Sequence, residues 1–328
     1  MGFFSSSSTV RKMGSYSKER LMAVLGLTGL IAGALAVGIG LTVLLAIYVN
    51  KTAGGIVFLL MCLGLAFGVM PYVDRKFFRM RAAFAYIATE VLIRKTPMPE
   101  EGTVAQATTR LSERFGSLDP VVDAHNNVQR LSRSFFRAFD KFDHILPIDL
   151  NSLRSALVWV VNRIAPRIAD IALSYAVARQ DKDIKESSKD AVALVAQNPK
   201  PLIGAAVRSY LTEQFLGGLF GFLFTAAACA AVFALAYKTS GSLTHGIPVD
   251  GAKTVGVFAG GFASLLIGIP VGALAAWFLR TAYLEPIGLT MLLARFHSTI
   301  EGQSVDPAMR TRIENASSNL RKASKLLG

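Results

Sequence analysis

The chain has 328 residues, of which 52% are apolar and only 17% are charged. The apolar residues fall in long blocks instead of at amphipathic spacing, and this excludes an ordinary soluble globular protein. The formal net charge of +13 leaves two classes of anionic partner to weigh, lipid headgroups and nucleic acid.

Four runs without Asp, Glu, Lys or Arg predict four transmembrane helices, at residues 21–49, 55–73, 216–237 and 255–278. The first run has 29 residues, about 44 Å as a helix at 1.5 Å per residue. It exceeds a hydrocarbon core of roughly 30 Å, so we expect it to tilt or protrude. The predicted fold is an all-α integral membrane protein with two transmembrane hairpins.

Lys and Arg residues are unevenly divided by the four predicted spans. The N-terminal tail, the segment 74–215 and the tail after residue 278 carry four, 21 and seven of them, whereas the other two loops carry three together. Because cytoplasmic segments retain an excess of basic residues, this split of 32 to three predicts that both termini and the central segment are cytoplasmic. We therefore expect a multi-pass protein of the inner or plasma membrane, with its basic face toward anionic lipid headgroups.

Nucleic acid is a less suitable partner than lipid. The central segment itself carries a net charge of only +5, and no nucleic-acid-binding motif occurs in it. The cluster of phenylalanines near Phe139 has helical spacing, which favours core packing over base stacking. We therefore expect no nucleic-acid partner.

The rest of the chain is predicted to be helical, in five regions. Residues 1–20 form a basic disordered tail, 21–73 the first hairpin, 74–215 a helical cytoplasmic domain, 216–278 the second hairpin and 279–328 the C-terminal region. Sustained alternation of apolar and polar residues is absent, so we expect no sheet. The domain packs either as a small bundle, which its length favours, or as helices lying along the membrane surface.

Proline-containing dipeptides mark where helices of the domain begin. Asp119-Pro120 combines an N-cap residue with proline at the first helical position, and Asn198-Pro199 breaks the chain before a helix that leads into the third span. Ser187 and Asp190 form a weaker capping pattern between them. Pro166 lies inside a predicted helix, which we expect to be kinked there.

The C-terminal region contains two predicted elements. Residues 281–294 are apolar but too short to cross the membrane, and Arg280 and Arg295 bracket them, which is typical of an interfacial or re-entrant segment. Asp306-Pro307 then begins a helix with a heptad seam that could dock on a partner or on the central domain. The seam consists of Met309, Ile313, Ala316, Leu320, Ala323 and Leu327.

Residues that carry chemistry are scarce in this sequence. The four histidines lack a second ligand type at metal spacing, and Cys62 and Cys229 both lie inside predicted spans. P-loop, dinucleotide-binding and nucleophile-elbow motifs are absent. We therefore predict no catalytic site, no metal site and no cofactor.

The clearest pattern is a row of small residues on one face of the fourth span. Such rows let two helix backbones approach closely, which is how helices associate in lipid. The row consists of Gly256, Gly260, Ser264, Gly268, Gly272 and Ala276, and Pro270 adds a bend. Weaker rows occur in the third span at Gly217, Gly221, Thr225 and Cys229, and in the first at Gly29, Gly33, Ala36 and Gly40.

Glu285 is the ionisable residue nearest to a span that could meet a solute. The spans contain no ionisable residue, and this argues against a pump or coupled carrier. Glu285 is either an interfacial carboxylate that pairs with Arg280 or Arg295, which is the favoured interpretation, or part of a transport site.

A stretch in the second half of the chain resembles the end of the choline transporter-like family. The resemblance lies in residues 170–203, with Tyr175, the run 187–191 and Asn198, followed by two spans and Ile300-Glu301-Gly302. It covers under half of the chain, and that family has about twice as many spans. The resemblance implies movement of a small amine or lipid precursor, and no substrate residue is carried over from it.

Two functions follow from these observations. The first is a non-enzymatic membrane scaffold or assembly subunit, a homo-oligomer or part of a larger membrane complex, whose spans pack through small residues. The alternative is a transporter or channel protomer for a small solute, with a membrane-embedded enzyme as a third and weaker reading.

Overall fold

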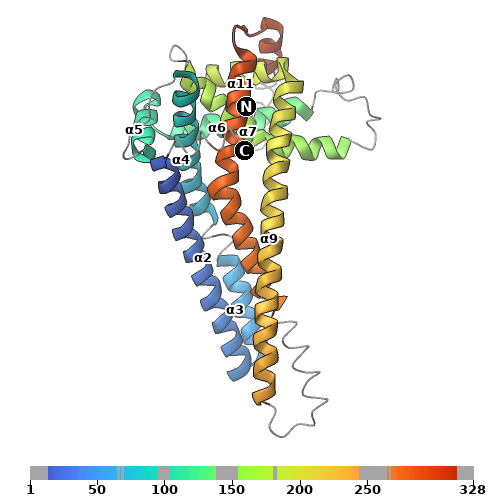
Figure 1. The fold of residues 1–328 in the computed structure, drawn as a ribbon. Helices are drawn as coiled ribbons and strands as arrows, with labels where there is room; N and C mark the ends of the chain where they lie inside the picture. Colours follow the sequence, from blue (N-terminus) through green and yellow to red (C-terminus); the bar gives the residue numbers. More distant parts are fainter. Residues whose placement is uncertain are drawn as a thin grey trace. The chain divides into compact units, whose positions relative to one another are not determined.

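The computed structural model describes residues 14–64, 67, 70–94, 103–137, 154–179, 183–243, 264–265 and 267–315. Throughout these ranges the secondary structure is helical and no strand occurs, which confirms the all-α prediction. Figure 1 labels most of the helices, which are α2 (Gly14–Tyr48), α3 (Lys51–Gly64), α4 (Met70–Thr89), α5 (Thr103–Phe115), α6 (Asp119–Arg137), α7 (Arg154–Ala178), α8 (Ile184–Gln197), α9 (Pro199–Leu243) and α11 (Glu285–Ile300). Two π-helical turns, η2 (Glu90–Arg94) and η4 (Arg280–Leu284), and helical stretches at 267–279 and 307–315 complete the description.

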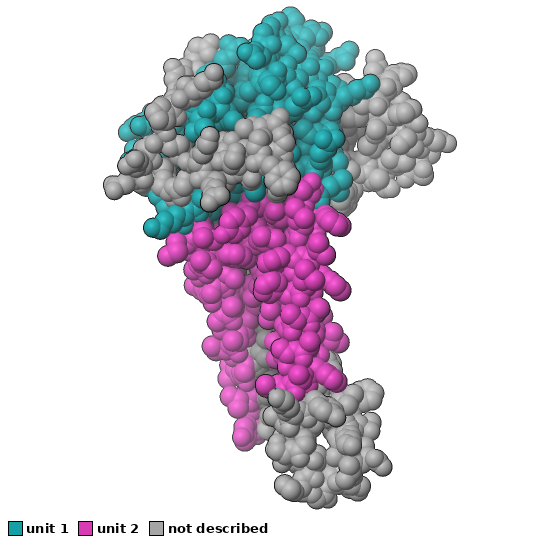
Figure 2. Space-filling view, in the orientation of Figure 1, with its two compact units in different colours: residues 1–20, 63–211, 286–328 teal, residues 21–62, 212–285 magenta. Residues whose placement is uncertain are grey.

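The chain forms two compact units, which Figure 2 shows in different colours. Unit 1 contains residues 1–20, 63–211 and 286–328, and unit 2 contains residues 21–62 and 212–285. The helical domain therefore includes more than the predicted central segment, because the segment before the first span and the C-terminal region both join it. The long helices α2 and α9 each contribute residues to both units.

Three helices of the described chain are long and apolar enough to cross a membrane: Tyr16–Thr42, Pro199–Leu235 and Ile267–Ile300. They contain most of the first and third predicted spans and the C-terminal part of the fourth. The second predicted span is described only in part, since α3 ends at Gly64 and residues 65–66 and 68–69 lie outside the described ranges. By length and composition the chain thus has the helices of a multi-pass membrane protein.

Unit 1 is built around α7. Every residue of 167–177 is buried, and α7 packs against α4, α6 and α8. Apolar residues of α7 such as Ile164, Ile168 and Ile171 form one core with residues of α4, α8 and α11. More than one face of α7 is therefore buried, because neighbouring helices also cover the side opposite these residues.

Local sequence signals placed several helix ends correctly. α6 begins at Asp119 and α9 begins at Pro199, as the two proline dipeptides predict. The stretch 307–315 begins after Asp306, whose Oδ1 accepts a hydrogen bond from the backbone N–H of Ala308 at 2.9 Å. Each of these ends depends on a cap or a proline that acts within one turn of helix.

The prediction of a disordered tail is wrong for residues 14–20, which form the start of α2 in unit 1. Tyr16 and Arg20 are buried there. The Tyr16 hydroxyl donates to the carbonyl oxygen of Met80 at 3.3 Å, and Arg20 Nη1 donates to the Tyr16 hydroxyl at 2.9 Å. The order of this segment comes from α4, which is distant in sequence, so local composition could not reveal it. Residues 1–13 lie outside the described ranges.

Two other expectations differ from the structure. α8 begins at Ile184, so Ser187 and Asp190 lie inside it as buried residues and not at its cap. Residues 281–294, expected as a separate interfacial or re-entrant element, continue as helix through η4 into α11. Leu292 and Phe296 of α11 are fully buried in the core of unit 1, because apolar residues of the domain surround them.

Candidate functional site

Four of the six small residues predicted in the fourth span lie in the described chain, and they face α9 within unit 2. Gly256 and Gly260 lie outside the described ranges. The other four, Ser264, Gly268, Gly272 and Ala276, run antiparallel to the row of the third span, Gly217, Gly221, Thr225 and Cys229. We call these two rows together the α9 seam.

The backbones of the α9 seam approach so closely that a methyl group does not fit at its centre. A Cβ atom added to Gly221 would lie 2.7 Å from Cβ of Ala276 and 2.9 Å from the carbonyl oxygen of Gly272. One added to Gly272 would overlap Thr225 Oγ1 and lie 2.6 Å from the carbonyl oxygen of Gly221. Glycine is therefore required at both positions by the neighbouring backbone.

A polar contact adds to the packing at one end of the α9 seam. The Cys229 thiol donates to the carbonyl oxygen of Ser264 at 3.2 Å. A Cβ atom at Gly268 would overlap Cys229 Sγ and lie 3.2 Å from the carbonyl oxygen of Thr225. Cys229 thus acts as a small packing residue with a weak donor where the two helices pack closely.

The small-residue row of the first span has a different environment. Gly29, Gly33, Ala36 and Gly40 are all exposed. A Cβ atom added to any of the three glycines would meet nothing within 4 Å. Within the described chain, the row of small residues on α9 is therefore covered by the fourth span, whereas the row on α2, which is spaced by three and four, is exposed.

Glu285 is half-buried at the start of α11, and its backbone N–H donates to the carbonyl oxygen of Arg280. The helix places Arg295 ten residues further on, about 15 Å along the axis at 1.5 Å per residue. A direct ion pair between Glu285 and Arg295 is therefore not formed in this helix, which removes one of the two predicted partners.

Unit 1 contains a buried polar chain that sequence analysis missed. Ser174 Oγ of α7 lies 2.6 Å from Thr89 Oγ1 of α4 and 2.8 Å from His297 Nε2 of α11. Thr89 donates to the carbonyl oxygen of Ala85 at 2.6 Å, so Ser174 donates to Thr89 and accepts from the imidazole. Three helices distant in sequence are thereby joined.

A serine next to a histidine nitrogen at this distance also matches a nucleophile and its base. Ser174 is fully buried, however, so a substrate in solvent does not reach its hydroxyl. In the direction derived above, the serine hydroxyl accepts a hydrogen bond from the imidazole, which is the reverse of activation by a general base. The chain Thr89, Ser174 and His297 therefore fits a structural role.

A second buried polar group lies one helical turn earlier on α7. Asp170 Oδ2 accepts from Arg81 Nε at 3.0 Å and from Arg81 Nη2 at 2.6 Å. His125 of α6 lies with Nδ1 4.0 Å from Asp170 Oδ1, and its Nε2 lies 2.8 Å from Gln129 Nε2. The pKa of His125 is lowered from 6.5 to about 4, chiefly by burial, while the charge of Asp170 opposes this shift and that of Arg81 adds to it. His125 is therefore neutral at physiological pH.

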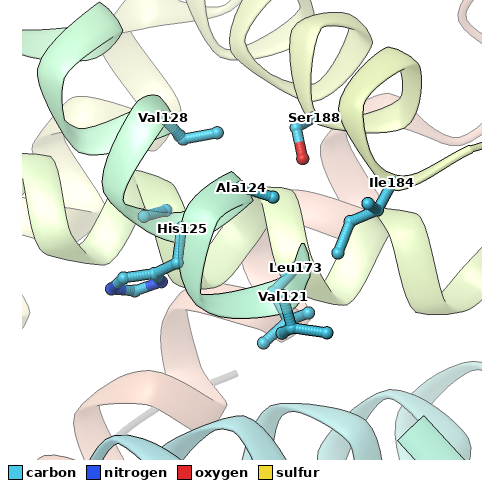
Figure 3. Close-up of a pocket in the computed structure, with 8 residues that line it drawn as sticks. Val121, Ala124, His125, Val128, Leu173, Ile184 and Ser188 are labelled. Carbon is cyan, nitrogen blue, oxygen red and sulfur yellow. The ribbon is translucent and has the colours of Figure 1, made fainter. Parts of the chain in front are cut away.

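His125 also borders a narrow crevice, shown in Figure 3, where α6, α7 and α8 meet. The lining is mostly apolar, and the crevice has no room for a water molecule. The lining residues are Val121, Ala124, His125, Val128, Ala169, Leu173, Ile184 and Ser188. It is a packing defect and not a ligand pocket.

The buried polar residues of α7 carry no sequence signal of their own. Arg167, Asp170 and Ser174 are spaced by three and four, so they read as the solvated side of an amphipathic helix. Only their partners on α4 and α11 show that this side is buried. Among the described residues, no group of three or more His, Cys, Asp or Glu side chains could hold a metal ion.

Comparison with known proteins does not place this chain in a family. No family model matches it, and neither a curated protein nor a solved structure matches it. Functional conclusions therefore rest on the residues and their geometry.

Proposed function

We propose that this chain is a non-enzymatic scaffold or assembly subunit of a membrane complex. In the proposed arrangement, four spans anchor a helical cytoplasmic domain in the inner or plasma membrane. The spans associate with another membrane helix, from a second copy of the chain or from a partner subunit.

The contrast between two rows of small residues carries this proposal. On α9 the row at Gly217, Gly221, Thr225 and Cys229 is occupied by the fourth span, with backbone contacts that exclude a methyl group. On α2 the row at Gly29, Gly33, Ala36 and Gly40 also consists of small residues, and it is exposed with no neighbour among the described residues that would meet a side chain at its glycines. Because small residues at this spacing favour close helix pairing in lipid, the open row fits an incoming helix.

A substitution at the centre of the open row tests the proposal. Gly33→Leu should block close approach and shift the protein in lipid nanodiscs from a larger complex toward a single copy, as measured by native mass spectrometry. Gly218→Leu is the matched control, because Gly218 is also exposed with nothing within 4 Å. Its neighbours one turn away, Gln214 and Phe222, already prevent close approach, so this variant should behave like the wild type.

Two results would contradict the scaffold. One is wild-type protein that is a single copy in nanodiscs and retains no other protein. The other is wild-type protein that alone moves a cationic amine into proteoliposomes, with a loss of flux in Glu285→Gln. The second result would establish the transporter that the family resemblance implies.

The proposed orientation rests on the charge split of 32 to three. Single cysteines at Ser7, Lys182 and Ser324 should be shielded from an impermeant thiol reagent in intact cells, whereas one at Ser242 should be labelled. Labelling at Lys182 from outside would reverse the assignment.

Exposed basic residues of unit 1 support contact with anionic headgroups. Lys18 stands on α2, Lys76 and Arg79 on α4 and Arg208 on α9, each on a helix close in sequence to a proposed span. Basic residues at such positions are attracted to the negative surface of the cytoplasmic leaflet.

A further inference from the structure

The helix at 307–315 lies against α8 within unit 1. Its start is capped by Asp306, and its residue Ile313 is fully buried. Met309 and Val305 pack on the same core while remaining partly exposed. In its described part, the apolar attachment of this helix therefore depends on one fully buried side chain.

Arg310 supplies the polar attachment. Its Nη2 lies 2.5 Å from Glu186 Oε2, and its Nη1 lies 3.1 Å from Asp190 Oδ1, so the guanidinium bridges two carboxylates one turn apart on α8. Its Nε lies 3.2 Å from Glu314 Oε1 on the same helix. The side chain of Arg310 is one-third exposed, whereas that of Asp190 is fully buried.

The segment between α11 and the helix at 307–315 is held in place where it leaves α11 and has no helical structure after that. Gly302 adopts a φ of +74°, a left-handed conformation that favours glycine, and ends α11 there. Asn198 Nδ2 donates to Gln303 Oε1 at 2.7 Å, which ties the chain to the junction of α8 and α9. Residues 304–306 follow without helical structure. Rotation within these three residues moves the helix while Gln303 stays in place, and it removes the partial packing of Val305 on the core.

We propose that residues 307–315 form a latch, a helix that opens from α8 and closes on it while the rest of unit 1 stays folded, with Arg310 as the group that holds it closed. Opening the latch separates the guanidinium from both α8 carboxylates and exposes Asp190 and Ile313 to water. Hydration of the freed carboxylates offsets part of the lost attraction between them and the guanidinium. This conformational device is independent of the proposed scaffold function.

Hydrogen–deuterium exchange of the full chain in nanodiscs tests the latch. Arg310→Gln should raise the exchange rate of peptides covering 307–315 by about tenfold or more, since the closed state loses its bridge. Arg312→Gln is the matched control: Arg312 has the same charge, lies on the same helix and is exposed. It should change the rate by less than about twofold. Arg310→Lys keeps the positive charge but lacks the planar guanidinium that reaches both carboxylates, and it should give an intermediate exchange rate.

The hydrogen–deuterium exchange of peptides from α11 shows whether 307–315 is a latch or an integral part of the core. If 307–315 is a latch, α11 residues 289–296 keep their protection in Arg310→Gln. Loss of protection in α11 together with 307–315 would overturn the proposal, because the helix would then be needed for the fold. Equal rates in Arg310→Gln and Arg312→Gln would also overturn it, since Arg310 would not be the holding group.

Discussion

Arg81 of α4 and Asp170 of α7 form an ion pair inside unit 1, in which Nε and Nη2 of Arg81 both donate to Asp170 Oδ2, at 3.0 and 2.6 Å. The Asp170 side chain is 2% exposed and that of Arg81 is 22% exposed. Each charge has been moved largely out of water, so each depends on the other for compensation. The pair joins two helices separated by 89 positions in the chain.

Breaking this pair from one side should be costly. Arg81→Met leaves a buried carboxylate without its guanidinium partner, so we expect a loss of about 3–5 kcal/mol in the free energy of unfolding. The double variant Arg81→Met with Asp170→Leu should recover a large part of that loss, because neither charge of the pair is then present. Thermal or denaturant unfolding in detergent measures both. Additive losses in the double variant would show that the two residues are not coupled.

His125 should make stability depend on pH. Burial holds its pKa at about 4 in the folded chain against 6.5 when unfolded, so between these values the unfolded chain binds a proton that the folded chain does not. The free energy of unfolding therefore falls as the pH drops from 6.5 toward 4, by about 3 kcal/mol over this whole window. Above pH 6.5 His125 is neutral in both states and adds no pH dependence.

The variant His125→Gln isolates this contribution, because carboxylates titrate in the same range in both proteins. The difference in unfolding free energy between wild type and variant should decrease toward low pH across this window. A difference that stays constant from pH 7 to pH 4 would mean that His125 is not held neutral by the fold.

A glycine-to-alanine substitution in the α9 seam should destabilise the protein. Gly272→Ala places a methyl group 2.6 Å from the carbonyl oxygen of Gly221, which is backbone and cannot rotate away, so we expect a loss of about 1–3 kcal/mol. Gly218→Ala is the control, since a methyl group there meets nothing within 4 Å. Thermal unfolding in nanodiscs compares the two, and equal midpoints would mean that the seam is not closely packed.

Arg114 should stabilise the end of α7. Its guanidinium donates to the carbonyl oxygens of Ala176, Val177 and Arg179, which face the end of a helix where carbonyl groups lack partners. Arg114→Met should therefore cost about 1–3 kcal/mol of unfolding free energy. Arg110→Met, at an exposed position of the same helix, should cost little. Similar losses of unfolding free energy in the two variants would mean that the positive charge on α5 is responsible, and not the hydrogen bonds to the end of α7.

Local chemistry explains why some elements could be predicted from the sequence. Asp119, Pro199 and Asp306-Pro307 set helix starts through caps and prolines, whose effects reach only one turn. The uncharged runs that became the long apolar helices are similarly local, because their length and composition are compared with the bilayer alone.

Partnership explains the predictions that failed. Ser187 and Asp190 have the composition of a cap, yet both are buried inside α8, because Ser and Asp suit a cap and a buried contact equally well. Tyr16 and Arg20 stand in a segment that reads as a disordered tail, yet the tyrosine contacts Met80 on α4. Neither outcome is encoded within the segment itself.

The sequence by itself determined that the chain is helical, that it carries long membrane-compatible helices and where several helices begin, since these depend on contacts within a few residues. Only the tertiary structure decided that 286–300 belongs to the domain core and that Asp170 and Ser174 are buried with partners on other helices. It also decided that, within the described chain, the small residues of α9 are covered while those of α2 are exposed. The physical reason is that burial and pairing are properties of two surfaces. The sequence of one helix specifies only the surface of that helix.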